Sequence, residues 1–213
     1  MDEGDLQGAL RILHLLNTAG SSPVEGSHAS EAGAVAVVAS EMKIHALDFW
    51  MRNPDYLAHE ILVLVDNGEL DQQWMDQAEK LLEGDEPDLR RYPMLRYKFG
   101  AYEPIDNSFS YLVAAGLAAC HRFGEPGKVQ RTDFYLFQQG RALAKQIVDE
   151  YAELEWYPRQ AGLVALVGNG RSGSELKGRQ YELAEYAQTR IGSVIQPIAD
   201  TVLEKLSELR ARL

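Results

Sequence analysis

The sequence predicts a mainly α-helical protein that carries one β-hairpin. Apolar residues recur at spacings of three and four along most of the chain, which indicates helices with one buried face. Two runs instead alternate apolar and polar residues, at 117–123 and 132–137, and the stretch GEPGKVQR separates them. Alternation on both sides of a Gly/Pro-rich turn predicts a hairpin. Hydrophobic residues make up 46% of the chain, which suffices for a packed core.

The first region, residues 1–85, is expected to be helical. A Gly/Ser-rich loop at 17–30 follows the first helix, and the alternating run at 34–39 leaves a short strand open as an alternative to the start of the second helix. Asn53 and Pro54 predict a new helix, because asparagine caps free N–H groups and proline suits the first turn. The expected helices lie at about 6–16, 35–50, 54–67 and 71–83.

The second region, residues 86–150, combines a short helix with the hairpin. Pro104 and Asp106 start this helix, and Gly116 is expected to end it in a left-handed conformation. The hairpin follows, with GEPGKVQR as a flexible tip, and helical periodicity resumes at 138–154. A helix followed by a hairpin, the wing, is the layout of a winged helix. The predicted fold is therefore a winged helix with helices on its N- and C-terminal sides.

The third region, residues 151–213, is also expected to be helical. After a break at 168–178, apolar residues from Ala184 to Leu213 recur with heptad-like spacing, and Pro197 is expected to kink the helix. Such a seam either packs on its own domain or presents its surface to a partner. The candidate partner-binding residues are Tyr181, Tyr186, Ile191, Val194, Ile198 and Val202.

Charge sets limits on nucleic-acid binding. The chain has 21 basic and 32 acidic residues, and its net charge of −11 repels phosphate backbones overall. The predicted helix before the wing offers mainly Glu103, Asp106 and Asn107 and no basic residue, so it is poorly suited to read base edges. Basic residues near the wing can still contact DNA phosphates, dock a protein or simply be solvated. These candidates are Arg90, Arg91, Arg96, Lys98, Arg122, Lys128 and Arg131.

No pattern of catalytic residues emerges. GNGRSG at 168–173 matches G-x-G-x-x-G, but the following residues predict helix where a dinucleotide site needs a second strand. Asp55, Asp88 and Glu175 lie at helix starts or in loops, whereas a metal-dependent nuclease needs carboxylates on adjacent strands. The five histidines lack the spacing of a zinc site and are interpreted as ordinary core or surface residues. We therefore expect a non-enzyme with no catalytic residue, cofactor or metal.

Cellular location follows from composition. A single cysteine excludes an intramolecular disulfide and fits a reducing compartment. The start MDEGDLQG is acidic where a secretory signal is basic, and the longest apolar run, at 32–39, is too short to cross a bilayer. The expected location is the cytoplasm, away from membranes.

Three segments resemble a known family. RYKFGAYEPIDNSFSYLVAAGLA, FYLFQQGRALA and HALDFWMRNPDYLAHEIL, within residues 41–145, are similar to winged-helix middle-component subunits of bacterial three-component defence systems of the Lamassu type. Ala101 stands where that pattern has proline, and Gln138 where it has threonine or serine. The resemblance implies a non-enzymatic adaptor between a coiled-coil ATPase of the SMC type and an effector nuclease. The alternative is a winged-helix transcriptional regulator or antitoxin that binds DNA.

Overall fold

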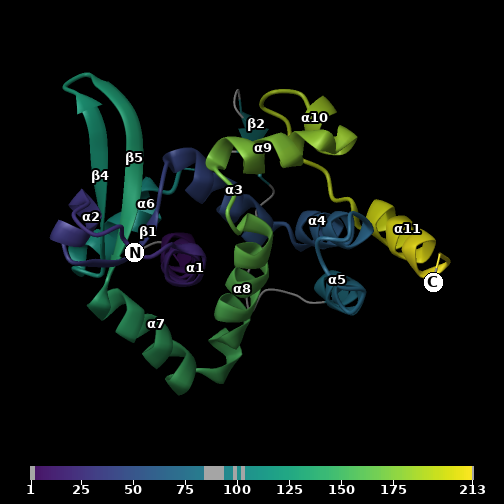
Figure 1. Cartoon of the computed structure of the whole chain (residues 1–213), viewed down its shortest axis with the longest axis horizontal. Coiled ribbons are helices and arrows are strands. Elements are labelled where there is room, and N and C mark those ends of the chain that lie inside the picture. Colours follow the sequence, from purple (N-terminus) through teal and green to yellow (C-terminus); the bar gives the residue numbers. More distant parts are fainter. Residues whose placement is uncertain (1–2, 84–93, 98–99, 102–103, 213) are drawn as a thin grey trace.

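Helices form most of the molecule, and a three-stranded sheet projects from one side of it (Figure 1). The computed structural model describes residues 3–83, 94–97, 100–101 and 104–212. Helix α1 (Glu3–Ala19) lies near the centre, with Ile12 and Leu16 buried on its inner face. Helices α6 (Asp106–Ala114) and α8 (Trp156–Gly168) pack against α1. One continuous hydrophobic core joins the N-terminal, middle and C-terminal parts of the chain.

The predicted hairpin is confirmed, and a third strand completes its sheet. Strands β4 (Ala118–Glu125) and β5 (Lys128–Phe137) pair antiparallel, and β1 (Ala34–Val38) pairs with the other edge of β5. The sheet order is β1-β5-β4. The prediction that a helix starts within 34–39 is therefore wrong, and the strand alternative is confirmed. Ala36 and Val38, two residues apart, bury their side chains in the core, as the alternation of a strand requires. The expected flexible tip is shorter than predicted, since only Pro126 and Gly127 lie between the strands.

The helices after β1 follow the prediction with small changes. Ser40 adopts a left-handed φ of 74°, and its hydroxyl accepts a hydrogen bond from the Lys43 N–H at the start of α3 (Glu41–Arg52). Pro54 begins α4 (Pro54–Asp66) as expected, but the Asn53 amide donates to the Phe49 carbonyl at 2.7 Å and does not cap the helix. The other helices in this part of the chain are α2 (His28–Glu31) and α5 (Trp74–Glu83).

Gly116 ends α6 with a φ of 67°, which confirms the expected left-handed turn before the hairpin. After the hairpin, α7 (Gln138–Glu150) leads through a short 3-10 turn, η1 (Ala152–Glu155), into α8. The run AGLVALV lies in α8. The predicted break at 168–178 is only partly a loop, because Ser172 and Glu175 form a reciprocal capping box at the start of α9 (Gly173–Glu182).

The prediction of one long C-terminal helix is wrong. This part of the chain forms two helices, α10 (Ala184–Gln188) and α11 (Ala199–Arg210), with a non-helical segment at 189–198 between them. Gly192, with a φ of 82°, turns this segment so that it hydrogen-bonds to the chain at 94–96, next to the two-residue strands β2 (Arg96–Tyr97) and β3 (Gly100–Ala101). The spacing of apolar residues predicted one helix, because this spacing carries no information about pairing with a distant segment of the chain.

Candidate functional site

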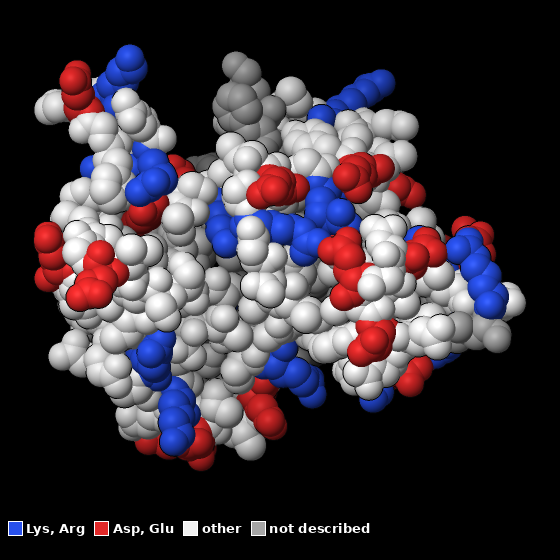
Figure 2. All heavy atoms as spheres, viewed as in Figure 1, with Lys and Arg blue, Asp and Glu red and all other residues white. Residues whose placement is uncertain are grey.

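The four candidate DNA contacts that the structure describes, Arg96, Arg122, Lys128 and Arg131, do not form a continuous basic surface. Arg122 and Lys128 are exposed on the hairpin, but the Arg131 guanidinium forms an ion pair with Asp133 at 2.9 Å. Figure 2 shows acidic and basic side chains next to each other at the hairpin tip. Mixed charge at the tip attracts phosphates only weakly. Arg90, Arg91 and Lys98 lie outside the described residues.

Arg96 has a structural role. Its guanidinium donates to the backbone carbonyls of Ala187 and Thr189 and lies 5.4 Å from the centre of the Tyr181 ring. These contacts fasten the segment after α10 to the chain at 96. Because its described contacts are internal, Arg96 is poorly placed for a contact with a DNA backbone.

The C-terminal seam packs mostly within the molecule. Tyr186, Ile198 and Val202 are buried in the core. The Tyr186 hydroxyl accepts from the Ala101 N–H at 2.6 Å, and burial raises the pKa of this tyrosine to about 12. Tyr181 and Val194 are half-buried, and only Ile191 of the six candidates is largely exposed, at 66%. This stripe therefore offers little apolar surface to a partner.

A groove beside the hairpin gathers exposed apolar side chains. Its volume is about 790 Å³, and Met42, Tyr97 and Val129 on its walls are 45%, 60% and 54% exposed. Figure 2 shows the hairpin standing away from the rest of the molecule, with a notch beside it. Apolar side chains grouped at one hollow are typical of surfaces that bind other molecules. The groove is lined by Ser40, Glu41, Met42, His45, Tyr97, Val129, Gln130, Arg131, Thr132 and Lys177.

Among the described residues, no strand pairs with the edge of β5 that runs along this groove. Strand β1 ends at Val38, opposite Phe134, so β5 extends beyond its partner from Lys128 to Asp133. Val37 exchanges backbone hydrogen bonds of 2.9 Å with Ser21 on the outer side of β1. The N–H and C=O groups of successive residues point to opposite sides of a strand. Since those of Val37 point outward to Ser21, those of Val38 and Phe134 face each other. The N–H and C=O groups of Thr132, two residues before Phe134, then point to the open edge. An open edge of this kind is a template for an additional strand.

Two titratable groups line the floor of the groove. The Lys177 amine donates to the Ala101 carbonyl at 3.3 Å, and burial lowers the pKa of Lys177 to about 8. His45 is buried, with its Nε2 atom 3.7 Å from a Glu41 carboxylate oxygen, and burial lowers its pKa. This groove could not be predicted from the sequence, because its walls come from four segments that are distant in the chain. The exposure of Met42, Tyr97 and Val129 is a property of the fold and leaves no local signal in the sequence.

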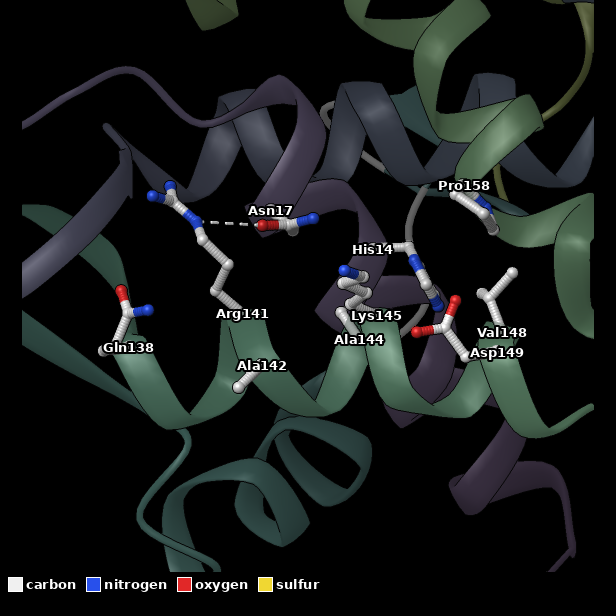
Figure 3. A pocket seen from close by; sticks show the side chains of 10 residues that line it. All are labelled: His14, Asn17, Gln138, Arg141, Ala142, Ala144, Lys145, Val148, Asp149 and Pro158. Atoms are coloured by element: carbon white, nitrogen blue, oxygen red, sulfur yellow. Dashed lines mark hydrogen bonds between the residues drawn. The ribbon is translucent and has the colours of Figure 1, made fainter.

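A second pocket lies between α1, α7 and α8, with a volume of about 640 Å³ (Figure 3). His14 of α1 points into it, yet the His14 side chain is almost entirely buried. Neither ring nitrogen of His14 has a hydrogen-bond partner among the described residues. Arg141 crosses the pocket to donate to the Asn17 side chain at 3.2 Å and to the Val35 carbonyl at 3.0 Å.

The structure places the His28 and His121 rings 3.5 Å apart, a pairing that the sequence spacing did not predict. Within the described ranges, however, no three His, Cys, Asp or Glu residues are grouped as metal ligands. None of the described helices has both the length and the apolar character needed to cross a bilayer.

No protein-family model matches the chain, and neither a curated protein nor a solved structure shows a significant match to it.

Proposed function

We propose that this protein is a cytoplasmic adaptor that binds a partner protein in the groove beside its hairpin. The observation that carries the proposal is the combination of three exposed apolar side chains with an open strand edge in one hollow. An extended segment of the partner would pair with Lys128–Asp133 and place apolar side chains against Met42 and Tyr97. In this proposal the chain acts by binding alone, and the described residues form no active site.

The order of elements supports a winged helix with a large insertion. Helix α1, strand β1 and helix α3 come first, and helix α6 and the β4–β5 hairpin complete the unit after the insertion that carries α4 and α5. Strand β5 is central in the sheet. Together with the resemblance to defence-system subunits, this order favours a role beside an SMC-like coiled-coil ATPase and an effector nuclease.

A protein partner fits the electrostatics better than DNA does. The net charge of −11 opposes phosphate binding, and the exposed face of α6 carries Asp106, Asn107 and Ser110 with no basic side chain in the helix. A contact of the wing with duplex DNA inside the complex is compatible with Arg122 and Lys128, as an accessory to protein binding.

Co-purification with the products of neighbouring genes tests the adaptor proposal. We expect the ATPase subunit to co-elute with the wild-type chain and to be lost with Val129→Glu, which puts a charge on the apolar wall. Leu203→Glu is the matched control, since Leu203 is a similarly exposed apolar residue on α11, away from the groove. A wild-type chain that elutes alone, or equal loss of the partner in both variants, would contradict the proposal.

The second candidate function is a DNA-binding regulator or antitoxin. It predicts a mobility shift on duplex DNA that weakens with salt and disappears when Arg122, Lys128 and Arg131 are replaced by Glu. We expect no shift of the isolated chain, even at low salt. A salt-sensitive shift that needs these residues would favour the regulator over the adaptor.

A further inference from the structure

We propose that the pocket between α1, α7 and α8 is a binding site for a small organic acid with one negative charge. Three features carry this inference: the buried His14 ring, whose nitrogens have no hydrogen-bond partner among the described residues, the basic side chains of α7 and the apolar walls of the pocket (Figure 3). The site is separate from the groove beside the hairpin, with no lining residue in common. It therefore stands independently of the adaptor role.

His14 is the strongest sign of a ligand. Its side chain is 1% exposed, and neither ring nitrogen finds a hydrogen-bond partner in the described part of the chain. A buried polar group without a hydrogen-bond partner is costly, because it has given up its hydrogen bonds to water, and an apolar ring of similar shape avoids this cost. Burial lowers the pKa of His14 to about 4, so the ring is neutral at pH 7 and offers one donor and one acceptor. A bound molecule that hydrogen-bonds to the ring would remove the cost.

The basic residues of α7 indicate that the ligand of this pocket carries a negative charge. Arg141 and Lys145 are one helical turn apart and project from α7 toward α1 (Figure 3). Arg141 is held by its bonds to Asn17 and Val35, and its fork retains further N–H groups for an anion. The first turn of α7, at Gln138, has no side-chain cap and adds the positive end of the helix dipole.

The other lining residues narrow the class of ligand. Asp149 lies near His14 at the far end of the pocket, so the site has two basic groups and one acidic group. A single negative charge matches that balance, whereas a phosphate dianion would be repelled by the Asp149 carboxylate. Ala142, Val148 and Pro158 form apolar walls. The volume of about 640 Å³ is in the usual range for small-molecule sites.

NMR of the full-length chain at pH 7 tests the inference, with the His14 ring signal as the reporter. We expect benzoate, a monoanion with an apolar body, to shift this signal saturably, and its neutral analogue benzamide to bind about tenfold more weakly. Lys145→Gln should weaken benzoate binding by a similar factor. Lys128→Gln, which removes the same charge from the exposed hairpin, should leave benzoate affinity unchanged.

A second variant separates binding from folding. His14→Phe should raise the melting temperature of the free protein, because it removes an unpaired polar group, and should abolish any further rise on adding benzoate. Absence of a saturable benzoate shift, or equal affinity in Lys145→Gln and Lys128→Gln, would overturn the assignment. Inorganic phosphate that binds more tightly than benzoate would overturn the monoanion class. A lower melting temperature for His14→Phe would contradict an unpaired ring.

Discussion

At the scale of single residues, buried His14 makes folding sensitive to acid. In the folded chain the pKa of His14 is lowered from 6.5 to about 4 by burial. Between these two values the unfolded chain binds a proton at His14 that the folded chain does not. The free energy of unfolding therefore falls as the pH drops from 6.5 toward 4, by up to about 3 kcal/mol from this residue.

Denaturant unfolding of wild type and His14→Phe at pH 7 and pH 5 measures this effect. We expect the variant to lose less stability than the wild type between the two pH values. Some acid sensitivity should remain, because burial and the neighbouring Lys205 also lower the pKa of His59 to about 4. Equal losses in the two proteins would show that His14 titrates normally in the folded state.

At the scale of elements, Gly140 allows α7 to pack closely on the base of the hairpin. A Cβ atom at Gly140 would come within 2.5 Å of the Leu117 carbonyl oxygen and 2.6 Å of a Leu136 methyl group. We expect Gly140→Ala to reduce the free energy of unfolding by about 1–3 kcal/mol, since the backbone of Leu117 cannot move aside cheaply. Chemical denaturation measures the change.

Gly162 in α8 provides the matched control. A Cβ atom there would meet no heavy atom within 4 Å. Gly162→Ala should therefore stabilise the protein by about 0.5–1 kcal/mol, through the higher helix propensity of alanine. If Gly140→Ala had the same stabilising effect, the close approach of α7 to Leu117 would be in doubt.

The sequence predicted elements best where the determining interactions are local. The hairpin, the turn at Gly116 and the restart at Pro54 depend on neighbouring residues, and all three were found. Strand β1 was only an alternative, because its partner β5 lies about a hundred residues further along the chain. The pairing of 189–198 with 94–96 was missed for the same reason. Both candidate sites were missed because only tertiary packing brings their walls together.

At the scale of the whole molecule, Asp55 links the C-terminal part to the core. One carboxylate oxygen accepts from the Ile198 N–H at 2.7 Å, and the other accepts from the Tyr56 N–H at 3.0 Å. The Tyr56 hydroxyl then donates to the Gln196 carbonyl at 2.9 Å. These bonds hold the segment that leads into α11 against the start of α4.

Asp55→Ala should loosen this attachment. We expect a loss of about 1–3 kcal/mol in the free energy of unfolding, because the buried N–H of Ile198 loses its acceptor. Limited proteolysis should show faster cleavage within 189–198. Asp55→Asn keeps one acceptor oxygen, so its free energy of unfolding and its cleavage rate should lie between those of Asp55→Ala and the wild type. Unchanged cleavage in Asp55→Ala would mean that the other contacts of α11 suffice to hold it.

The pairing of β1 with β5 has a consequence for synthesis on the ribosome. Strand β1 has been translated long before Phe134–Phe137, the residues with which it pairs, are made. At elongation rates of about 5–20 residues per second the delay is on the order of 5–20 s. During that time the apolar side chains of Ala36 and Val38 have no sheet to join, so the nascent chain needs shielding from aggregation until the hairpin emerges.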